Sequence, residues 1–187
     1  MPNSRKPPAG TGGISESDLL AGDQDERTNQ ETIAAAVEAA VLAGLMAVDD
    51  LVAARRLTDR LSPEAFTLAD HRAVAHGILL AISAGQPPHP LAVATAMQHA
   101  DVEAPPTWRG CLLSRLWMLA ADPPPACMVA WFLDQVEQQV IRRRIAEAGR
   151  VIGSVAHRGE LADVAVVVQS EAAAVLELLA GALDANA

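Results

Sequence analysis

The sequence contains no tyrosine, only two phenylalanines and three tryptophans, and its aromatic fraction is 3%. Alanine supplies much of the apolar content, which is 51% of the 187 residues. Alanine-rich stretches that are poor in β-branched residues favour helices. No segment alternates apolar and polar residues for long enough to indicate a sheet. We therefore expect an all-α protein, with ample apolar content for a core.

Positively charged residues are outnumbered by negatively charged ones: there are 14 Lys and Arg against 23 Asp and Glu, and the formal net charge is −9. Lys6 is the only lysine. Phosphate contact is mainly electrostatic, so an acidic chain is a poor general binder of nucleic acid. The only basic cluster consists of Arg142–Arg144 and Arg150. It could contact phosphate or an acidic groove on a partner. Because Arg143 and Glu147 are spaced i, i+4, it also fits a solvated, salt-bridged helix face.

Features of secreted or membrane proteins are few. Cys111 and Cys127 lie far apart in helical patterns, so we expect free thiols in a reducing cytoplasm rather than a disulfide. No run approaches the roughly 18 apolar residues of a membrane span. Arg5 and Lys6 precede no apolar segment of the kind that a signal peptide contains. We expect a cytoplasmic protein without membrane contact.

Motifs for catalysis and cofactor binding are missing. The GTGG of residues 10–13 has no Lys-Ser or Lys-Thr after it and no strand before it, so it is not a phosphate loop. The histidines form no i, i+4 pair, and capping or surface roles are expected for them. Asp49-Asp50 lies at a helix start, where electrostatics explains acidic residues. No serine lies on a nucleophile elbow. We expect no enzyme activity, no cofactor and no metal site.

Composition and the positions of prolines and glycines divide the chain into four parts. Residues 1–29 are rich in Pro, Gly, Ser, Asp and Glu, and they predict a disordered tail that cannot bury enough surface to order itself. Residues 30–125 predict a globular head of about six short helices. Residues 126–181 predict a long helix and a helical hairpin, followed by a short tail at 182–187. The head helices are expected at residues 30–48, 49–61, 62–66, 70–85, 90–99 and 107–121.

Three residues have specific roles in the expected head. Asp70 and Thr107 are expected to be N-caps, because both precede apolar helical patterns. Phe66 is expected to fill the core.

A helix from Ala126 to His157 is expected to connect the head to the hairpin. Pro123–Pro125 suits its start, and Gly159 lies just past its end. Its apolar stripe changes face between Val140 and Ile141, so the first half can pack on the head and the second half on the helix that follows. The link at 157–159 is short enough to require an antiparallel return. A single curved helix in one core is the alternative.

The hairpin carries more apolar surface than its own seam needs. We expect the seam to join Ile141, Ile145, Ile152 and Val155 with Leu161, Val164, Val168, Val175 and Leu179. A projecting hairpin that is apolar on two sides is expected to pair with a second copy in a two-fold four-helix contact. The candidate self-association surface comprises Val151, Ile152, Val155, Val167, Val168, Leu176 and Leu178.

Trp108, Trp117 and Trp131 occupy apolar helical positions, where core packing is the first expectation. Tryptophan and arginine are also common anchors of protein interfaces, and Trp131 lies near the root of the hairpin. The candidate partner-binding residues are Trp131, Arg142, Arg143, Arg144 and Arg150.

Taken in order, several segments resemble the N-terminal domain of bacterial DnaB-type replicative helicases. In that family a Glu and an apolar run lead into a Leu-Gly pair, and an acidic-Phe pair precedes His-Arg at the next helix. A Gly-x-Pro turn, a short helix and a long hairpin helix with a basic centre follow. The matching segments here are Val37–Met46, Leu61–Phe66 with His71-Arg72, Gly85–Pro87 with Leu91–Met97, and Ala126–His157. The resemblance covers about residues 31–181.

The resemblance implies a helical head plus a hairpin. It also implies that hairpins pair into dimers, that three dimers form a collar on a helicase ring, and that the collar docks primase. This sequence departs from the pattern at Trp108-Arg109-Gly110, which keeps one glycine of a usual pair, and at Pro90, which replaces an acidic residue. The partner can therefore differ.

The same resemblance suggests a function without catalysis. The sequence ends where the family's linker and RecA-like motor would begin, and GxxxxGK[ST] is absent from it. ATP hydrolysis and unwinding are therefore not carried over. We expect a non-catalytic protein-interaction and oligomerisation module in DNA replication, which docks primase, a helicase or a helicase loader. The alternative is a small helical nucleic-acid-binding regulator that uses Arg142–Arg144.

Overall fold

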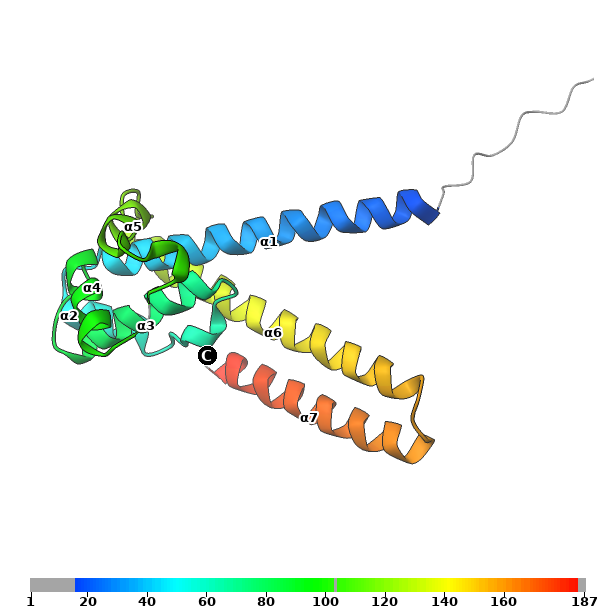
Figure 1. Cartoon of the computed structure of the whole chain (residues 1–187). Coiled ribbons are helices and arrows are strands. Elements are labelled where there is room, and N and C mark those ends of the chain that lie inside the picture. Colours follow the sequence, from blue (N-terminus) through cyan, green and yellow to red (C-terminus); the bar gives the residue numbers. More distant parts are fainter. Residues whose placement is uncertain (1–15, 103, 185–187) are drawn as a thin grey trace, which may run out of the picture. The chain divides into compact units, whose positions relative to one another are not determined.

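The computed structural model describes residues 16–102 and 104–184, and among them it contains helices and no strand (Figure 1). The prediction of an all-α protein is therefore confirmed. The α-helices are α1 (Glu16–Met46), α2 (Leu51–Thr58), α3 (Ala69–Ser83), α4 (Pro90–His99), α5 (Leu112–Leu119), α6 (Ala126–Ala156) and α7 (Leu161–Asp184), and the 3-10 helices are η1 (Pro63–Ala65) and η2 (Pro106–Trp108).

The chain forms two compact units, residues 1–33 and 34–187, and the division falls within α1. In the first unit α1 begins at Glu16, whereas the sequence places a disordered tail as far as residue 29. Residues 16–29 contain no proline and several good helix formers, so local propensity supports a helix even where little apolar surface can be buried. Residues 1–15 of that tail lie outside the described residues. The domain boundaries at 29, 125 and 181 stay predictions.

The second unit has one main core, which lies in its head. The C-terminal turns of α1 bury Val41, Leu42 and Leu45 against the other head helices. Phe66 has no exposed surface and fills the core as expected. The remaining buried members are Met46, Ala54, Leu61, Val74, Ala75, Ile78, Ala81, Ile82, Val93, Ala94, Met97, Leu116, Val129, Leu133 and Val136.

Helix boundaries follow local chemistry, with two corrections. Asp50 caps α2 by accepting a hydrogen bond from Val52 N at 2.8 Å. Asp70, however, lies in the first turn of α3, and its carboxylate accepts the Thr107 hydroxyl at 3.2 Å. Neither Asp70 nor Thr107 is therefore an N-cap. The helix expected at 107–121 is divided into η2 and α5, because Gly110 has a φ of +78°, which no right-handed helix contains.

Helix α6 belongs to two packing environments. Its first half places Val129, Leu133 and Val136 in the head core. Further along, Ala148 is buried again, where α6 packs on α7. The two helices run side by side in opposite directions in Figure 1, and α7 returns toward the head.

The seam between α6 and α7 has a different register from the expected one. Leu161 is 88% exposed, Ile145 is 46% exposed and Val168 is 38% exposed, so none of the three lies in the seam. Glu171 is partly buried and forms an ion pair with Arg144 at an N···O distance of 2.7 Å. A seam predicted from apolar residues alone excludes this carboxylate, which explains the error. The half-buried residues of α7 recur at helical spacing: Val164, Val167, Glu171, Ala174, Val175, Leu178 and Leu179.

The expectation that no apolar run approaches the length of a membrane span is wrong for helix α7. Its stretch Leu161–Gly181 is long and apolar enough, by length and composition alone, to cross a membrane, and none of that window is buried. No other helix among the described residues passes this test. A helix that packs on another protein can be as apolar as one that crosses a membrane. Glu171, within this stretch, forms an ion pair with Arg144.

Candidate interaction site

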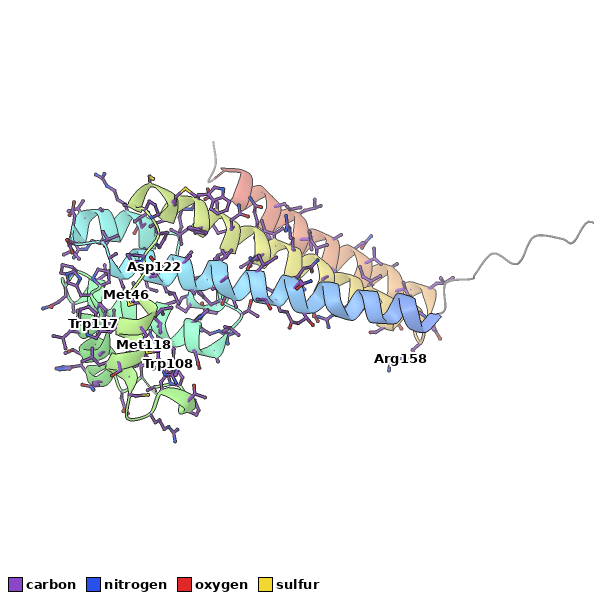
Figure 2. The ribbon with its side chains drawn as sticks, turned by 90° about the horizontal axis from the view of Figure 1, so that it is seen from above. Met46, Trp108, Trp117, Met118, Asp122 and Arg158 are labelled. Carbon is purple, nitrogen blue, oxygen red and sulfur yellow. The ribbon has the colours of Figure 1, made fainter. Side chains whose placement is uncertain are left out.

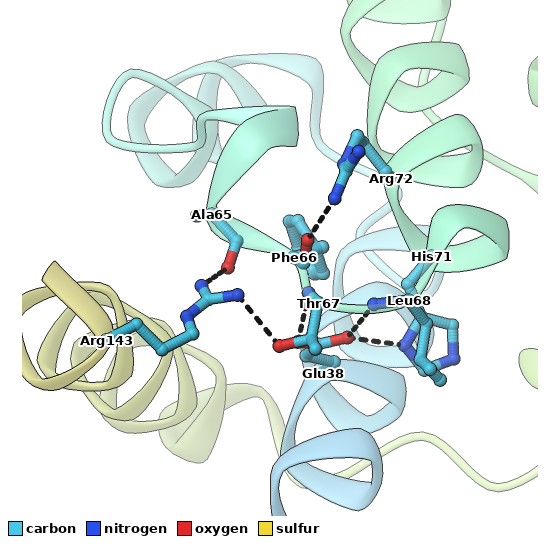
Figure 3. A network of polar contacts seen from close by, with 8 residues as sticks. All are labelled: Glu38, Ala65, Phe66, Thr67, Leu68, His71, Arg72 and Arg143. Atoms are coloured by element: carbon cyan, nitrogen blue, oxygen red, sulfur yellow. Dashed lines mark hydrogen bonds and ion pairs between the residues drawn. The ribbon is translucent and has the colours of Figure 1, made fainter. Parts of the chain in front are cut away.

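A buried carboxylate lies at the centre of the head's polar network (Figure 3). Glu38, on α1, has no exposed surface. Its Oε1 accepts a hydrogen bond from Thr67 N at 2.6 Å, and its Oε2 accepts one from His71 Nδ1 at 2.9 Å. Leu68 N approaches the same Oε2 at 3.4 Å. The charge is thus removed from water but surrounded by donors, which is the condition for burying a charged group.

The pKa of Glu38 reflects these two opposing effects. Burial raises it, but the hydrogen bonds from His71, Thr67 and Leu68 together lower it by more, so that the pKa lies below its ordinary value of 4.5. Glu38 is therefore ionised at neutral pH.

The network continues outward through residues 65–68, which we call the Phe66 loop. Arg72, on α3, donates to the Phe66 carbonyl oxygen at 3.1 Å. Arg143, on α6, donates to the Thr67 hydroxyl at 2.9 Å and also to the Ala65 carbonyl oxygen. Charged side chains from three helices, α1, α3 and α6, thus hold four consecutive residues.

The role of this network was not predicted. Sequence reasoning expects capping or surface roles for histidines, but His71 is buried against Glu38. One signal was available: Glu38 interrupts the apolar face that Val37, Val41 and Leu42 form on the same helix. A carboxylate in such a stripe needs buried donors, and a histidine that follows a loop can supply one.

Most of the arginine cluster is engaged within the chain. Arg143 contacts the Phe66 loop, Arg144 pairs with Glu171, and Arg150 pairs with Glu147. The expected pair between Arg143 and Glu147 is wrong, because Arg143 reaches the head instead. Arg142 is exposed. A role for these arginines in binding a partner stays a prediction.

The predicted self-association residues divide into two groups. Val151, Ile152, Val155, Val167 and Leu178 are half-buried, whereas Val168 and Leu176 are exposed. Leu178 lines a hollow of 360 Å³ together with Val140 and Ile141, so it faces α6 rather than a free outer surface.

Helix α7 carries a continuous apolar face that the second unit leaves uncovered, and we call it the outer stripe. Its members recur at intervals of three or four residues, so they share one side of the helix. They span about 22 Å at 1.5 Å per residue. All are exposed, Leu176 at 65%. The outer stripe consists of Leu161, Ala165, Val168, Ala172 and Leu176.

A second apolar surface lies on the head, where α3, α4 and α5 meet. It is a groove of 790 Å³ with a floor of small residues. Leu91 and Trp117 stand at its edges, 60% and 56% exposed. Figure 2 shows Trp117 beside Met118, which is 63% exposed. We call this the head groove; its floor comprises Ala81, Ala84, Ala92, Thr95 and Ala96.

The tryptophans are less buried than core packing requires. Trp108 is half-buried against the core, but Trp117 and Trp131 are largely exposed, Trp131 at 48%. Trp131 meets Phe132 edge to face, with 4.9 Å between ring centroids. Periodicity places an aromatic residue on an apolar face without showing whether another element covers that face.

The described part of the chain shows no group of three or more His, Cys, Asp and Glu side chains that could hold a metal ion. His89 approaches Asp49 at 3.6 Å, and His157 Nδ1 lies 2.8 Å from the Gly153 carbonyl oxygen. Cys111 and Cys127 are free.

Comparisons with known proteins agree with this reading of the fold. No protein-family model and no curated protein matches the chain. Among solved structures, it is similar to the N-terminal domain of DnaB helicase from Mycobacterium tuberculosis, with 25% identity and a TM-score of 0.62. The similarity covers 75% of this chain and 95% of that one. The resemblance seen in the sequence is therefore confirmed in the structure: the chain has the fold of the DnaB helicase N-terminal domain.

Proposed function

We propose that this protein is a non-catalytic interaction module of DNA replication, which pairs with a second copy through its hairpin and docks a replication protein such as a primase, a helicase or a helicase loader. The likeness to the N-terminal domain of a DnaB helicase supports the replication context. The details of pairing and docking rest on the surfaces described above.

The observation that carries the proposal is the outer stripe of α7. Between Leu161 and Gly181 no residue is buried, although the stretch is apolar enough for a membrane span. Each exposed aliphatic side chain forgoes roughly 1.5–3 kcal/mol of burial free energy. A two-fold contact between hairpins covers the same stripe on both chains, because a closed dimer uses one surface twice.

The head groove is the proposed docking surface for the replication partner. It lies over a close contact between α3 and α4, where a Cβ added at Gly77 would lie 2.6 Å from Met97 Cγ. Its small floor residues leave room for a partner helix, and an exposed tryptophan is a common anchor in such contacts.

No nucleotide chemistry is assigned to these residues. The sequence has no GxxxxGK[ST], and its one lysine is Lys6, so no lysine can cradle phosphates in a P-loop.

The self-association test uses Leu176→Glu. This residue is 65% exposed, so the substitution leaves the seam with α6 intact and places a charge in the proposed contact. Because the contact is two-fold symmetric, the dimer contains the new charge twice. A loss of about 1.4 kcal/mol of binding free energy per charge raises the dimer dissociation constant roughly a hundredfold. Sedimentation or light scattering at tens of micromolar should show a wild-type dimer or larger and a folded monomeric variant.

The matched control is Leu91→Glu, on the head groove, where the leucine is 60% exposed. It should leave self-association unchanged and weaken only partner docking. A wild-type protein that stays monomeric, or dimers that dissociate with Leu91→Glu and persist with Leu176→Glu, would contradict the proposed pairing surface.

A further inference from the structure

The Phe66 loop connects the head to the hairpin through charged side chains on both of its faces. Glu38 binds its inner face through Thr67 N and Leu68 N. Arg143 binds its outer face through the Thr67 hydroxyl and the Ala65 carbonyl oxygen. Thr67 thus lies between the two charged side chains: Glu38 accepts from its backbone N–H and from its hydroxyl, and Arg143 donates to the same hydroxyl.

The position of Arg143 along α6 gives this contact a mechanical role. The last α6 residue in the head core is Val136. Arg60 holds α6 at the same level, through Asp134 at 2.8 Å and Glu137 at 3.0 Å. Arg143 lies two turns further on, about 10 Å along the helix axis. It therefore anchors the part of α6 that has already left the core, where a long helix is otherwise able to bend.

Apolar packing beside this joint is incomplete. A hollow of 360 Å³ opens between η1, α6 and α7, and its lining includes Ala65, Val140, Ile141 and Leu178. Unfilled space beside the joint removes the dispersion contacts that would hold the two parts rigidly together. The polar contact of Arg143 remains to set the direction of the hairpin.

We propose that the Phe66 loop is a two-sided clamp: Glu38 holds the loop in shape from the head core, and Arg143 uses that shape to fix the direction in which the hairpin leaves the head. Arg143 and Glu38 are positioning residues in this device. The consequence is that the loop sets the direction of the hairpin, which carries the outer stripe. A partner that displaces Arg143 from the loop frees the hairpin to reorient.

The test measures a distance from the head to the tip of the hairpin. Spin labels are placed at Ser114→Cys and Arg158→Cys, both exposed positions, after Cys111 and Cys127 are changed to serine. Figure 2 shows Arg158 at the end of the hairpin far from Trp117 and Met118. Labelled chains are diluted with unlabelled chains, so that only distances within one chain contribute and the result is independent of self-association.

Pulsed electron paramagnetic resonance should give one narrow distribution of label-to-label distances for the parent protein. Arg143→Ala should at least double the width of the distribution. Thr67→Val should also broaden it, because it removes the hydroxyl that both Arg143 and Glu38 contact, while the backbone N–H that Glu38 accepts from is kept. The double variant should be no broader than Arg143→Ala alone. The matched control is Arg142→Ala, an exposed neighbour in the same helix, which should leave the distribution unchanged.

Glu38→Gln tests the inner side of the clamp. The amide oxygen can still accept from Thr67 N, but the amide nitrogen then faces Leu68 N and His71 Nδ1 as a donor. The distribution should broaden as with Arg143→Ala. If this variant does not fold, Thr67→Val decides the matter. A narrow, unshifted distribution in both Arg143→Ala and Thr67→Val would overturn the proposal.

Discussion

Glu38 shows how much one buried charge can organise. It has no exposed surface, and its two oxygens accept from Thr67 N, Leu68 N and His71 Nδ1. A side chain that leaves these donors unsatisfied costs about 1–3 kcal/mol. The residue therefore specifies one conformation of the Phe66 loop in addition to any stability that it contributes.

The pH dependence of stability should report this carboxylate. Because the folded-state pKa of Glu38 is below its ordinary value of 4.5, its contribution is fully present above that value and is lost as pH falls through the lower folded pKa. We expect Glu38→Gln to lower the free energy of unfolding by about 1–3 kcal/mol at pH 7. Urea unfolding at a series of pH values measures this.

Comparison with the parent protein isolates the effect of Glu38, since the other carboxylates titrate equally in both proteins. The difference in stability between the two should narrow as pH falls below 4.5. A difference that is constant down to the lowest pH at which both proteins fold would contradict an ionised Glu38 as the source of the stabilisation.

At the scale of helices, the sequence was informative where residue type alone decides the conformation. Pro90 and His99 bound α4 as expected, and Pro123–Pro125 precede α6. Prolines fix φ and break helices whatever their surroundings. The seam of α7 depends instead on a tertiary partner, because Arg144 makes it favourable for Glu171 to turn inward. Apolar periodicity does not contain that information.

The candidate surfaces also include features that the sequence shows and features that only tertiary contacts determine. An excess of apolar residues on the hairpin can be read from the sequence, but the choice between Leu176 outside and Leu178 inside cannot. The two differ by about 200° around a helix, and only the contact with α6 decides which is exposed. The head groove was missed because its floor consists of small residues from separate segments, four alanines and Thr95, which carry no distinctive signal.

The contact of α1 with α6 gives a test at this scale. An added Cβ at Gly44 would lie 2.6 Å from Val129 Cγ2 and 3.2 Å from Pro124 Cγ. We expect Gly44→Ala to destabilise the protein by roughly 1–3 kcal/mol, because overpacking of rigid neighbours outweighs the gain in helix propensity. The thermal midpoint measures it. Gly181→Ala is the control, since nothing lies within 4 Å there and stability should stay or rise slightly. Equal midpoints for both variants would contradict this tight contact.

At the scale of the whole molecule, the second unit contains all of the core cluster, from Val41 to Val136. We expect a chain that begins at Gln30 to keep the melting temperature and the self-association of the full chain. Calorimetry and sedimentation on the two chains measure this. A melting temperature lowered by more than about 4 °C, which is roughly 1 kcal/mol for a chain of this size, would place part of the stability in residues 1–29.

The charge distribution favours the proposed module over a nucleic-acid-binding regulator. The net charge is −9, and Arg143, Arg144 and Arg150 already contact groups within the chain. Binding of phosphates by the cluster would have to break these contacts or rely on Arg142. We therefore expect no complex with duplex or single-stranded DNA at tens of micromolar protein and about 150 mM salt. Fluorescence anisotropy with labelled oligonucleotides measures binding, and a second series at about 50 mM salt detects any weak electrostatic contact. Micromolar binding that persists at the higher salt and is lost with Arg142→Ala would instead favour the regulator.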